Sequence, residues 1–121
     1  MLLYEDLSRA IIGAAIEVHG NLGPGYLESV YENALAKELT PRNIKFERQE
    51  LLEVIYKGEA MGKFRPDILV EGKIVVEIKA VTHFVHAHEA KAIHYLTATG
   101  MRLALLLNFG TPRLGIKRVI V

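Results

Sequence analysis

Three charged side chains interrupt an otherwise apolar part of the chain. Glu77 and Lys79 lie in the apolar run 74–80, and nine residues separate Asp67 from Glu77. Side chains alternate along a strand, so Glu77 and Lys79 would project from the same face. A charged group inside such a strand is costly unless it is paired or ligates an ion. If Asp67 shares that face, the two carboxylates and the ammonium predict a site that holds Mg²⁺ or Mn²⁺ and orients a water molecule, because hard divalent cations prefer oxygen ligands.

The loop between the two strands decides whether Asp67 shares that face. A two-residue loop, Glu71-Gly72, would place the carboxylates of Asp67 and Glu77 on opposite faces. A three-residue loop, Val70-Glu71-Gly72, with the glycine left-handed, would oppose Asp67 to Val75, diagonal to Glu77. We predict this three-residue geometry, or an equivalent bulge at Asp67. The alternative is an edge hairpin whose charged side chains form only a solvated ion pair.

The elements that would position these side chains follow from the apolar periodicity. Spacings of three and four residues predict helices over residues 4–19, 26–39 and 86–99, with Gly100 ending the third. Strands are expected over residues 44–56, 64–70, 74–80, 102–108 and 116–121. The order ααβββαββ predicts an α/β fold, with a mixed β-sheet flanked by helices. The length of 121 residues predicts a single domain over 1–121.

Composition excludes several classes of protein. The chain has no cysteine, so a disulfide scaffold, a cysteine-ligated zinc site and a thiol nucleophile are excluded. The formal net charge is +1, so nucleic-acid binding would require a local basic face. The residues that could supply this face are Lys63, Arg65, Lys79, Lys91, Arg102, Arg113, Lys117 and Arg118.

No segment is long and apolar enough to predict a membrane span, and the charged Glu5, Asp6 and Arg9 interrupt the start of the chain. We therefore expect a cytoplasmic protein that does not contact a membrane. Four histidines, at positions 83, 86, 88 and 94, suggest zinc as an alternative ligand. Their spacing does not place them on one helix face, so we expect these histidines to lie at the start of a helix and on the surface.

Two motifs carry a resemblance to a known family. Pro66-Asp67 followed by Glu77-Ile-Lys79 resembles the PD-(D/E)XK nuclease superfamily, and GYLESVY, with Gly25, Glu28 and Tyr31, resembles the signature of the GxxExxY family within it. Further similar segments are Val18-His19, Leu107-Asn108-Phe109-Gly110 and Lys117-Arg118. The resemblance runs from about residue 11 to the end of the chain. It implies a restriction-endonuclease-like core and a Mg²⁺- or Mn²⁺-dependent nuclease that hydrolyses phosphodiesters in DNA or RNA.

The resemblance also implies roles for individual residues. Asp67, Glu77 and the backbone carbonyl of Ile78 would hold the metal. Lys79 would position the attacking water or stabilise charge on the scissile phosphate. Glu28 would add a further acidic group to the site, through a metal-bound water.

Supporting contacts with phosphate are implied for Arg65, Tyr31, Lys91 and Tyr95. Tyr31 is alternatively a core tyrosine whose hydroxyl is satisfied within the protein. Related members usually carry glutamine where this chain has Lys91, four residues before Tyr95. That lysine would either contact phosphate or neutralise Glu77 and displace the metal. The alternatives to a nuclease are a nucleic-acid-binding module or a protein-interaction module on the same fold, with a homodimer as one arrangement.

Overall fold

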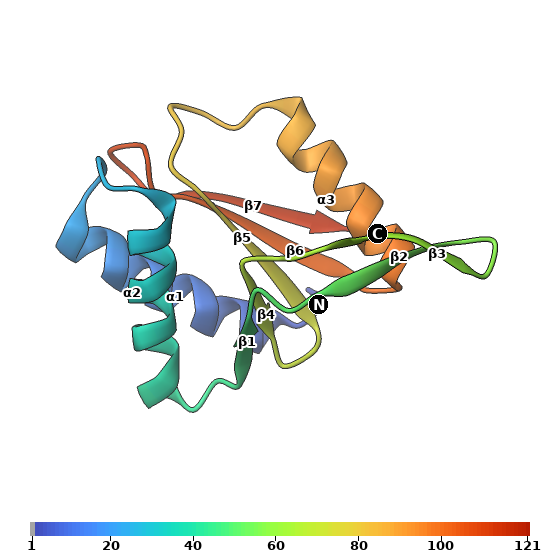
Figure 1. Ribbon diagram of the computed structural model, residues 1–121. Helices are drawn as coiled ribbons and strands as arrows, with labels where there is room; N and C mark the ends of the chain where they lie inside the picture. Colours follow the sequence, from blue (N-terminus) through green and yellow to red (C-terminus); the bar gives the residue numbers. More distant parts are fainter. Residues whose placement is uncertain (1) are drawn as a thin grey trace.

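A five-stranded mixed sheet forms the centre of the fold, in the strand order β1-β4-β5-β6-β7 (Figure 1). The computed structural model describes residues 2–121. Strands β5 and β6 are parallel and the other neighbours are antiparallel. The strands are β1 (Phe46–Arg48), β4 (Ile68–Val70), β5 (Ile74–Lys79), β6 (Leu103–Asn108) and β7 (Gly115–Ile120).

Helices cover both faces of this sheet. Helices α1 (Glu5–Leu22) and α2 (Glu28–Leu39) lie on one face, and α3 (His86–Thr99) lies on the other (Figure 1). The short helix η1 (Thr40–Arg42) connects α2 to β1. Alternation along β5 divides its side chains between two cores: Ile74, Val76 and Ile78 pack with α1 and α2, and Val75 packs with α3. Glu77 and Lys79 continue the face of Val75, so they point towards α3.

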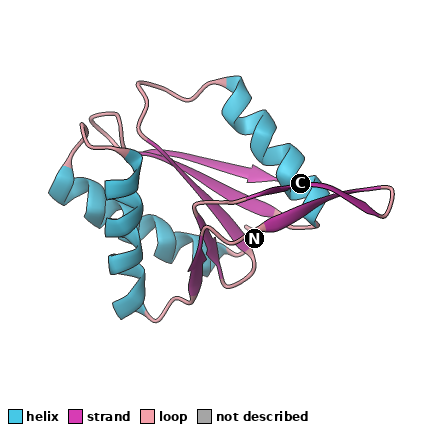
Figure 2. Ribbon diagram, viewed as in Figure 1, coloured by secondary structure: helices cyan, strands magenta, loops and turns pink. Residues whose placement is uncertain are grey.

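A separate hairpin stands beside α3. Strands β2 (Leu52–Tyr56) and β3 (Glu59–Phe64) pair only with each other, and Figure 2 shows their ribbon projecting beyond the main sheet. The turn residues Lys57 and Gly58 are both left-handed, as the tight turns of two-residue hairpins require. The ring of Phe64 stacks on Tyr95 of α3, with 3.8 Å between the centroids, which anchors the base of the hairpin.

The predicted α/β class is confirmed, while the predicted order ααβββαββ is wrong in its strands. Five strands precede α3, because the expected single strand over 44–56 is divided into β1 and β2 and because β3 forms a strand of its own. Gln49 lies at the division and is left-handed, with φ of 54°, which no continuous strand accommodates.

The three predicted helices are present. Helix α3 has its predicted bounds, and Gly100 follows it in the left-handed conformation. Helix α1 continues past the expected end at residue 19 to Leu22, and its capping residue is Gly23. Within residues 2–121, no helix has the length and apolar character needed to cross a membrane.

Candidate active site

The hairpin formed by β4 and β5 brings the two carboxylates together. Val70 pairs with Ile74, so the loop contains three residues, Glu71, Gly72 and Lys73. Extending this register by one residue places Asp67 directly opposite Glu77, and directly opposed residues share a face. The predicted odd-length loop is therefore present, with its residues shifted by one. Asp67 opposes Glu77 itself and not Val75, and both Glu71 and Gly72 are left-handed.

The Asp67 carboxylate is held by the strand that carries Glu77. Its Oδ2 accepts a hydrogen bond of 2.7 Å from the backbone N–H of Ile78. The carbonyl of Lys79 accepts from the N–H of Phe109 on the β6 side. Because backbone groups alternate in direction along a strand, the carbonyl of Ile78 points to the opposite side, towards Asp67. Two carboxylates and one carbonyl oxygen thus face the gap just before the start of β4.

The electrostatics of the pair are unfavourable without a cation. Burial raises the pKa of Glu77 from 4.5 to about 8, and the neighbouring Asp67 charge adds to the rise, while Lys79 and Lys91 oppose it. The pKa of Asp67 is also raised, first by burial and then by the charges of Glu32 and Glu28, against the Ile78 hydrogen bond and Lys79. Burying two carboxylates side by side disfavours ionisation of both, and a divalent cation between them would reverse that balance.

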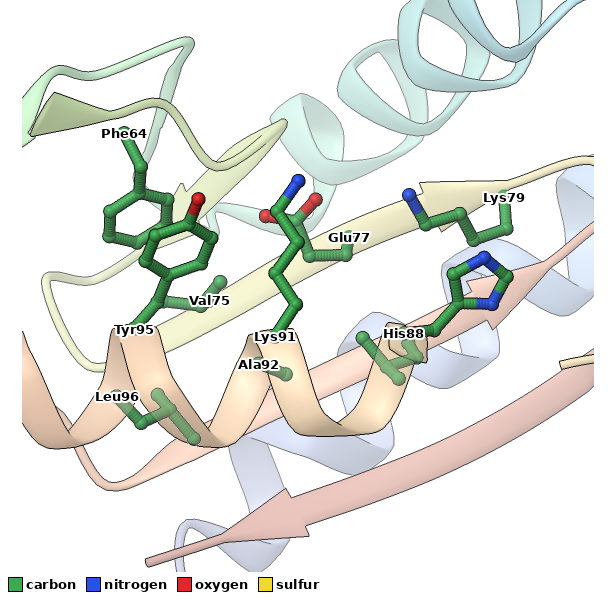
Figure 3. A pocket seen from close by; sticks show the side chains of 10 residues that line it. Phe64, Val75, Glu77, Lys79, His88, Lys91, Ala92, Tyr95 and Leu96 are labelled. Atoms are coloured by element: carbon green, nitrogen blue, oxygen red, sulfur yellow. The ribbon is translucent and has the colours of Figure 1, made fainter. Parts of the chain in front are cut away.

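Glu77 opens into a small pocket between the sheet and α3. Figure 3 shows Lys91 reaching from α3 towards the Glu77 carboxylate, with Lys79 further along β5. The Lys91 amino group also lies 5.6 Å from the centroid of the Tyr95 ring. Cationic and aromatic groups therefore surround one carboxylate, and the remaining lining residues are Phe64, Val75, His88, Ala92, Leu96 and Leu106.

Glu28 lies at the end of β5. Its Oε2 accepts a hydrogen bond of 3.1 Å from the backbone N–H of Ala80. Its charge reaches Asp67, whose pKa it helps to raise. Across residues 2–121, no three histidine, aspartate or glutamate side chains gather closely enough to hold a metal ion. Glu28 therefore stands apart from the Asp67–Glu77 pair, and the histidines do not form a cluster.

Two other predicted residues lie away from the carboxylate pair. Tyr31 is fully buried, its ring stacks on Phe109 with 4.6 Å between the centroids, and its hydroxyl donates a 2.6 Å hydrogen bond to the carbonyl of Gly23. The same hydroxyl accepts from the N–H of Tyr26 at 3.1 Å, so it corresponds to the core-tyrosine alternative. Arg65 is exposed at the end of β3, two residues before Asp67.

The basic residues do not form one continuous face. Arg118 donates to Ser8 and to the carbonyl of Leu3, both at 2.8 Å, on the α1 side of the sheet. Lys117 lies 3.6 Å from Glu89 of α3. Of the basic residues expected to contact phosphate, only Lys79 and Lys91 line the pocket beside Glu77.

Two side chains that were not among the expected site residues support the site. Glu32 on α2 is buried beside Asp67 and accepts hydrogen bonds from Arg48 and Gln49. Asn108 is buried at the end of β6 and joins it to the segment after β5: its Oδ1 accepts from Val81 N–H and its Nδ2 donates to the Val81 carbonyl, both at 3.0 Å. Asn108 could have been found from the sequence, because it is a polar residue at the end of an apolar strand and such a buried group needs hydrogen-bond partners. Glu32 lies on an amphipathic helix, where a glutamate gives no sign of a role in the site.

At the same point the chain passes unusually close to itself. A Cβ added at Gly110 would lie 2.5 Å from the backbone nitrogen of Val81 and 2.6 Å from the carbonyl carbon of Ala80. Only glycine fits such an approach of two backbones. The backbone that follows Lys79 at the end of β5 therefore packs directly against the loop after β6.

The donor set fits a hard divalent cation. Asp67 and Glu77 supply carboxylate oxygens, and the backbone direction supplies the Ile78 carbonyl, which is the oxygen chemistry that Mg²⁺ and Mn²⁺ prefer. The raised pKa of Glu77 is consistent with this assignment, because a site built for a cation places carboxylates where they repel one another without it.

The protein has a mixed sheet flanked by helices, and Asp67 faces Glu77 and Lys79 of the central strand β5. These features define a restriction-endonuclease-like α/β protein. The model of the PD-(D/E)XK nuclease superfamily matches residues 5–119, and the chain belongs to this superfamily. No curated protein matches the chain. The crystal structure of SSO0001 is similar, with a TM-score of 0.50 and 18% sequence identity over 94% of this chain and 77% of that chain. At that identity the likeness concerns the fold alone.

Proposed function

We propose that the protein is a Mg²⁺- or Mn²⁺-dependent nuclease that hydrolyses phosphodiester bonds in DNA or RNA. The observation that carries the proposal is the register of β4 and β5, in which Asp67 opposes Glu77 on the face that also bears Lys79. Superfamily membership supports a nuclease-type function. The segment with Gly25, Glu28 and Tyr31 further supports assignment to the GxxExxY family.

The proposed chemistry divides among the side chains of this face. A bound divalent cation would supply Lewis-acid stabilisation of the phosphate and a water of lowered pKa. Asp67, Glu77 and the Ile78 carbonyl would hold that cation, and Glu28 would act through a bound water. A water oxygen bonds to phosphorus while the bond from phosphorus to the leaving sugar oxygen breaks. The Lys79 ammonium would donate hydrogen bonds to the attacking water or to the phosphate oxygens as their charge develops.

The proposal is tested by metal binding and cleavage together. Mn²⁺ binding is measured by calorimetry, and cleavage is measured on single- and double-stranded DNA and RNA with Mg²⁺ or Mn²⁺. Asp67→Ala should abolish both, whereas Asp6→Ala, which removes an exposed carboxylate on α1, should leave both unchanged. Equal cleavage by the Asp67→Ala protein would assign the activity to another site or to a contaminant.

A non-catalytic nucleic-acid-binding module is the second candidate, and Lys91 favours it. This side chain reaches towards the Glu77 carboxylate and could substitute for the cation there (Figure 3). Such a module would bind nucleic acid with a strong salt dependence and without metal-dependent turnover. Salt-dependent binding by both the wild-type protein and the Asp67→Ala variant, with no Mn²⁺ uptake by either, would select this alternative.

A further inference from the structure

Glu32 is a buried carboxylate with both oxygens occupied. Its side chain lies on α2, Oε2 accepts from Arg48 Nε at 2.9 Å and Arg48 Nη2 at 2.7 Å, and Oε1 accepts from Gln49 Nε2 at 2.8 Å. Two guanidinium N–H groups and one amide N–H thus hold the carboxylate in a fixed orientation. These contacts leave it poorly suited to ligate a metal directly. Its charge acts on Asp67 through space, whereas its effect on the position of Asp67 passes through its hydrogen-bond partners.

Gln49 connects Glu32 to Asp67. Its side chain donates to Glu32, while its backbone N–H donates to the carbonyl oxygen of Asp67 at 3.1 Å. Gln49 adopts a left-handed conformation with φ of 54°, which costs a residue with a side chain about 1 kcal/mol. Such conformations persist where the surroundings hold them, and they occur disproportionately at functional sites. Here the surroundings are Glu32 at one end and Asp67 at the other.

We propose that Glu32 is a positioning residue for Asp67. By holding Gln49 it fixes the main chain at Asp67, and this keeps the Asp67 carboxylate on the Ile78 amide and opposite Glu77. The consequence for metal binding rests on the proposed function, whereas the placement of Asp67 does not. A purely structural role, in which the Glu32–Arg48 pair ties α2 to β1, would stabilise the protein without changing the position of the Asp67 carboxylate.

The backbone amide of Ile78 reports that position directly, because its hydrogen bond partner is Asp67 Oδ2. Hydrogen exchange of this amide is measured by NMR in two variants that preserve the fold. Glu32→Leu is similar in size and has no oxygen to accept from Gln49 Nε2, so it loses the Gln49 bond. Gln49→Gly removes the tether while tolerating the left-handed backbone. Each variant should raise the Ile78 exchange rate about tenfold relative to the buried amide of Leu105, as expected for the loss of one hydrogen bond.

The matched control is Glu38→Leu, since Glu38 lies on the same helix and its carboxylate bonds Arg42. It should leave Ile78 exchange unchanged. The conservative variant Glu32→Gln is the rescue, because the two amides at positions 32 and 49 can turn so that the oxygen of one accepts from the N–H of the other. It should restore at least part of the protection of Ile78, which a general loss of stability would not allow.

The outcomes separate this proposal from the proposed function. Unchanged Ile78 exchange in both single variants, or a rise equal to that of Leu105, overturns the positioning role even if the protein binds Mn²⁺. A selective, rescued rise in a protein that binds no Mn²⁺ supports the positioning role and overturns the metal-dependent function. If both hold, the Glu32→Leu and Gln49→Gly variants should bind Mn²⁺ about tenfold more weakly than the wild type and the Glu38→Leu control.

Discussion

The Glu77 carboxyl makes the stability of the metal-free protein depend on pH. Its pKa is about 8 in the folded protein and 4.5 without the fold. Between these values the folded protein retains a proton that the unfolded chain has released, so the free energy of unfolding falls as the pH rises. The contribution of Glu77 is complete below about pH 4.5 and is lost as the pH rises through about 8. Each pKa unit corresponds to about 1.4 kcal/mol, so the loss amounts to several kcal/mol.

Glu77→Gln removes this dependence, because glutamine has nearly the same shape and does not ionise. The variant should match the wild type at pH 5 and exceed its free energy of unfolding by about 2–4 kcal/mol at pH 8.5. Urea unfolding followed by circular dichroism, with EDTA present and at intervals from pH 5 to pH 9, measures this difference. The control is Glu53→Gln, an exposed carboxylate on β2, which should follow the wild type.

Mn²⁺ supplies the second half of the experiment. At pH 8.5 the cation should stabilise the wild-type protein by an amount that grows with the logarithm of its concentration above the dissociation constant, and it should stabilise Glu77→Gln far less. Wild-type and Glu77→Gln stabilities that run parallel over the whole pH range would refute the burial of a protonated Glu77. Equal stabilisation of both proteins by Mn²⁺ would refute its role as a ligand.

Three further predictions concern the surroundings of the pair. Lys91→Gln removes a charge that lowers the pKa of Glu77, so that pKa should rise. At pH 9 the variant should bind Mn²⁺ a few-fold more tightly, because the repulsion between the lysine ammonium and the metal cation is lost. Unchanged metal binding and unchanged nucleic-acid binding would place Lys91 outside the site. Tyr31→Phe should lower the free energy of unfolding by about 1–2 kcal/mol through its lost hydrogen bonds, while calorimetry shows unchanged Mn²⁺ affinity. Phe64→Ala should cost about 3 kcal/mol in urea unfolding by removing the stack on Tyr95, and a cost below 1 kcal/mol would show that the hairpin is not anchored there.

The carboxylate pair was predictable because its determinants are local. Asp67 and Glu77 lie on adjoining strands of one hairpin, so an odd number of loop residues is enough to give them a shared face. The sequence did not distinguish which three residues form the loop, since Val70 is as apolar as its strand neighbours. The left-handed glycine belongs to either loop, and only the pairing of Val70 with Ile74 decides between them.

The remainder of the site depends on contacts across the chain. Gln49 divides the expected strand over 44–56, and a glutamine gives no local signal of a left-handed conformation. Glu28 and Tyr31 are one helical turn apart, yet Glu28 reaches the rim of the sheet while Tyr31 lies in the core. Helical spacing predicts a shared side of a helix, but the depth of each side chain depends on how α2 lies against the sheet.

The close approach at Gly110 has a consequence for how substitutions spread through this protein. Position 110 carries no reactive group and is far from Lys79 in sequence, yet any side chain there must push against the backbone at Ala80 and Val81. The displaced strand would carry Lys79 with it. In a mutational scan, position 110 should therefore behave like a residue of the site itself, while an exposed strand position such as Glu53 accepts most replacements. Positions that do not tolerate substitution would therefore include Gly110, which fixes the position of the strand that carries Lys79, as well as the residues that would perform the chemistry.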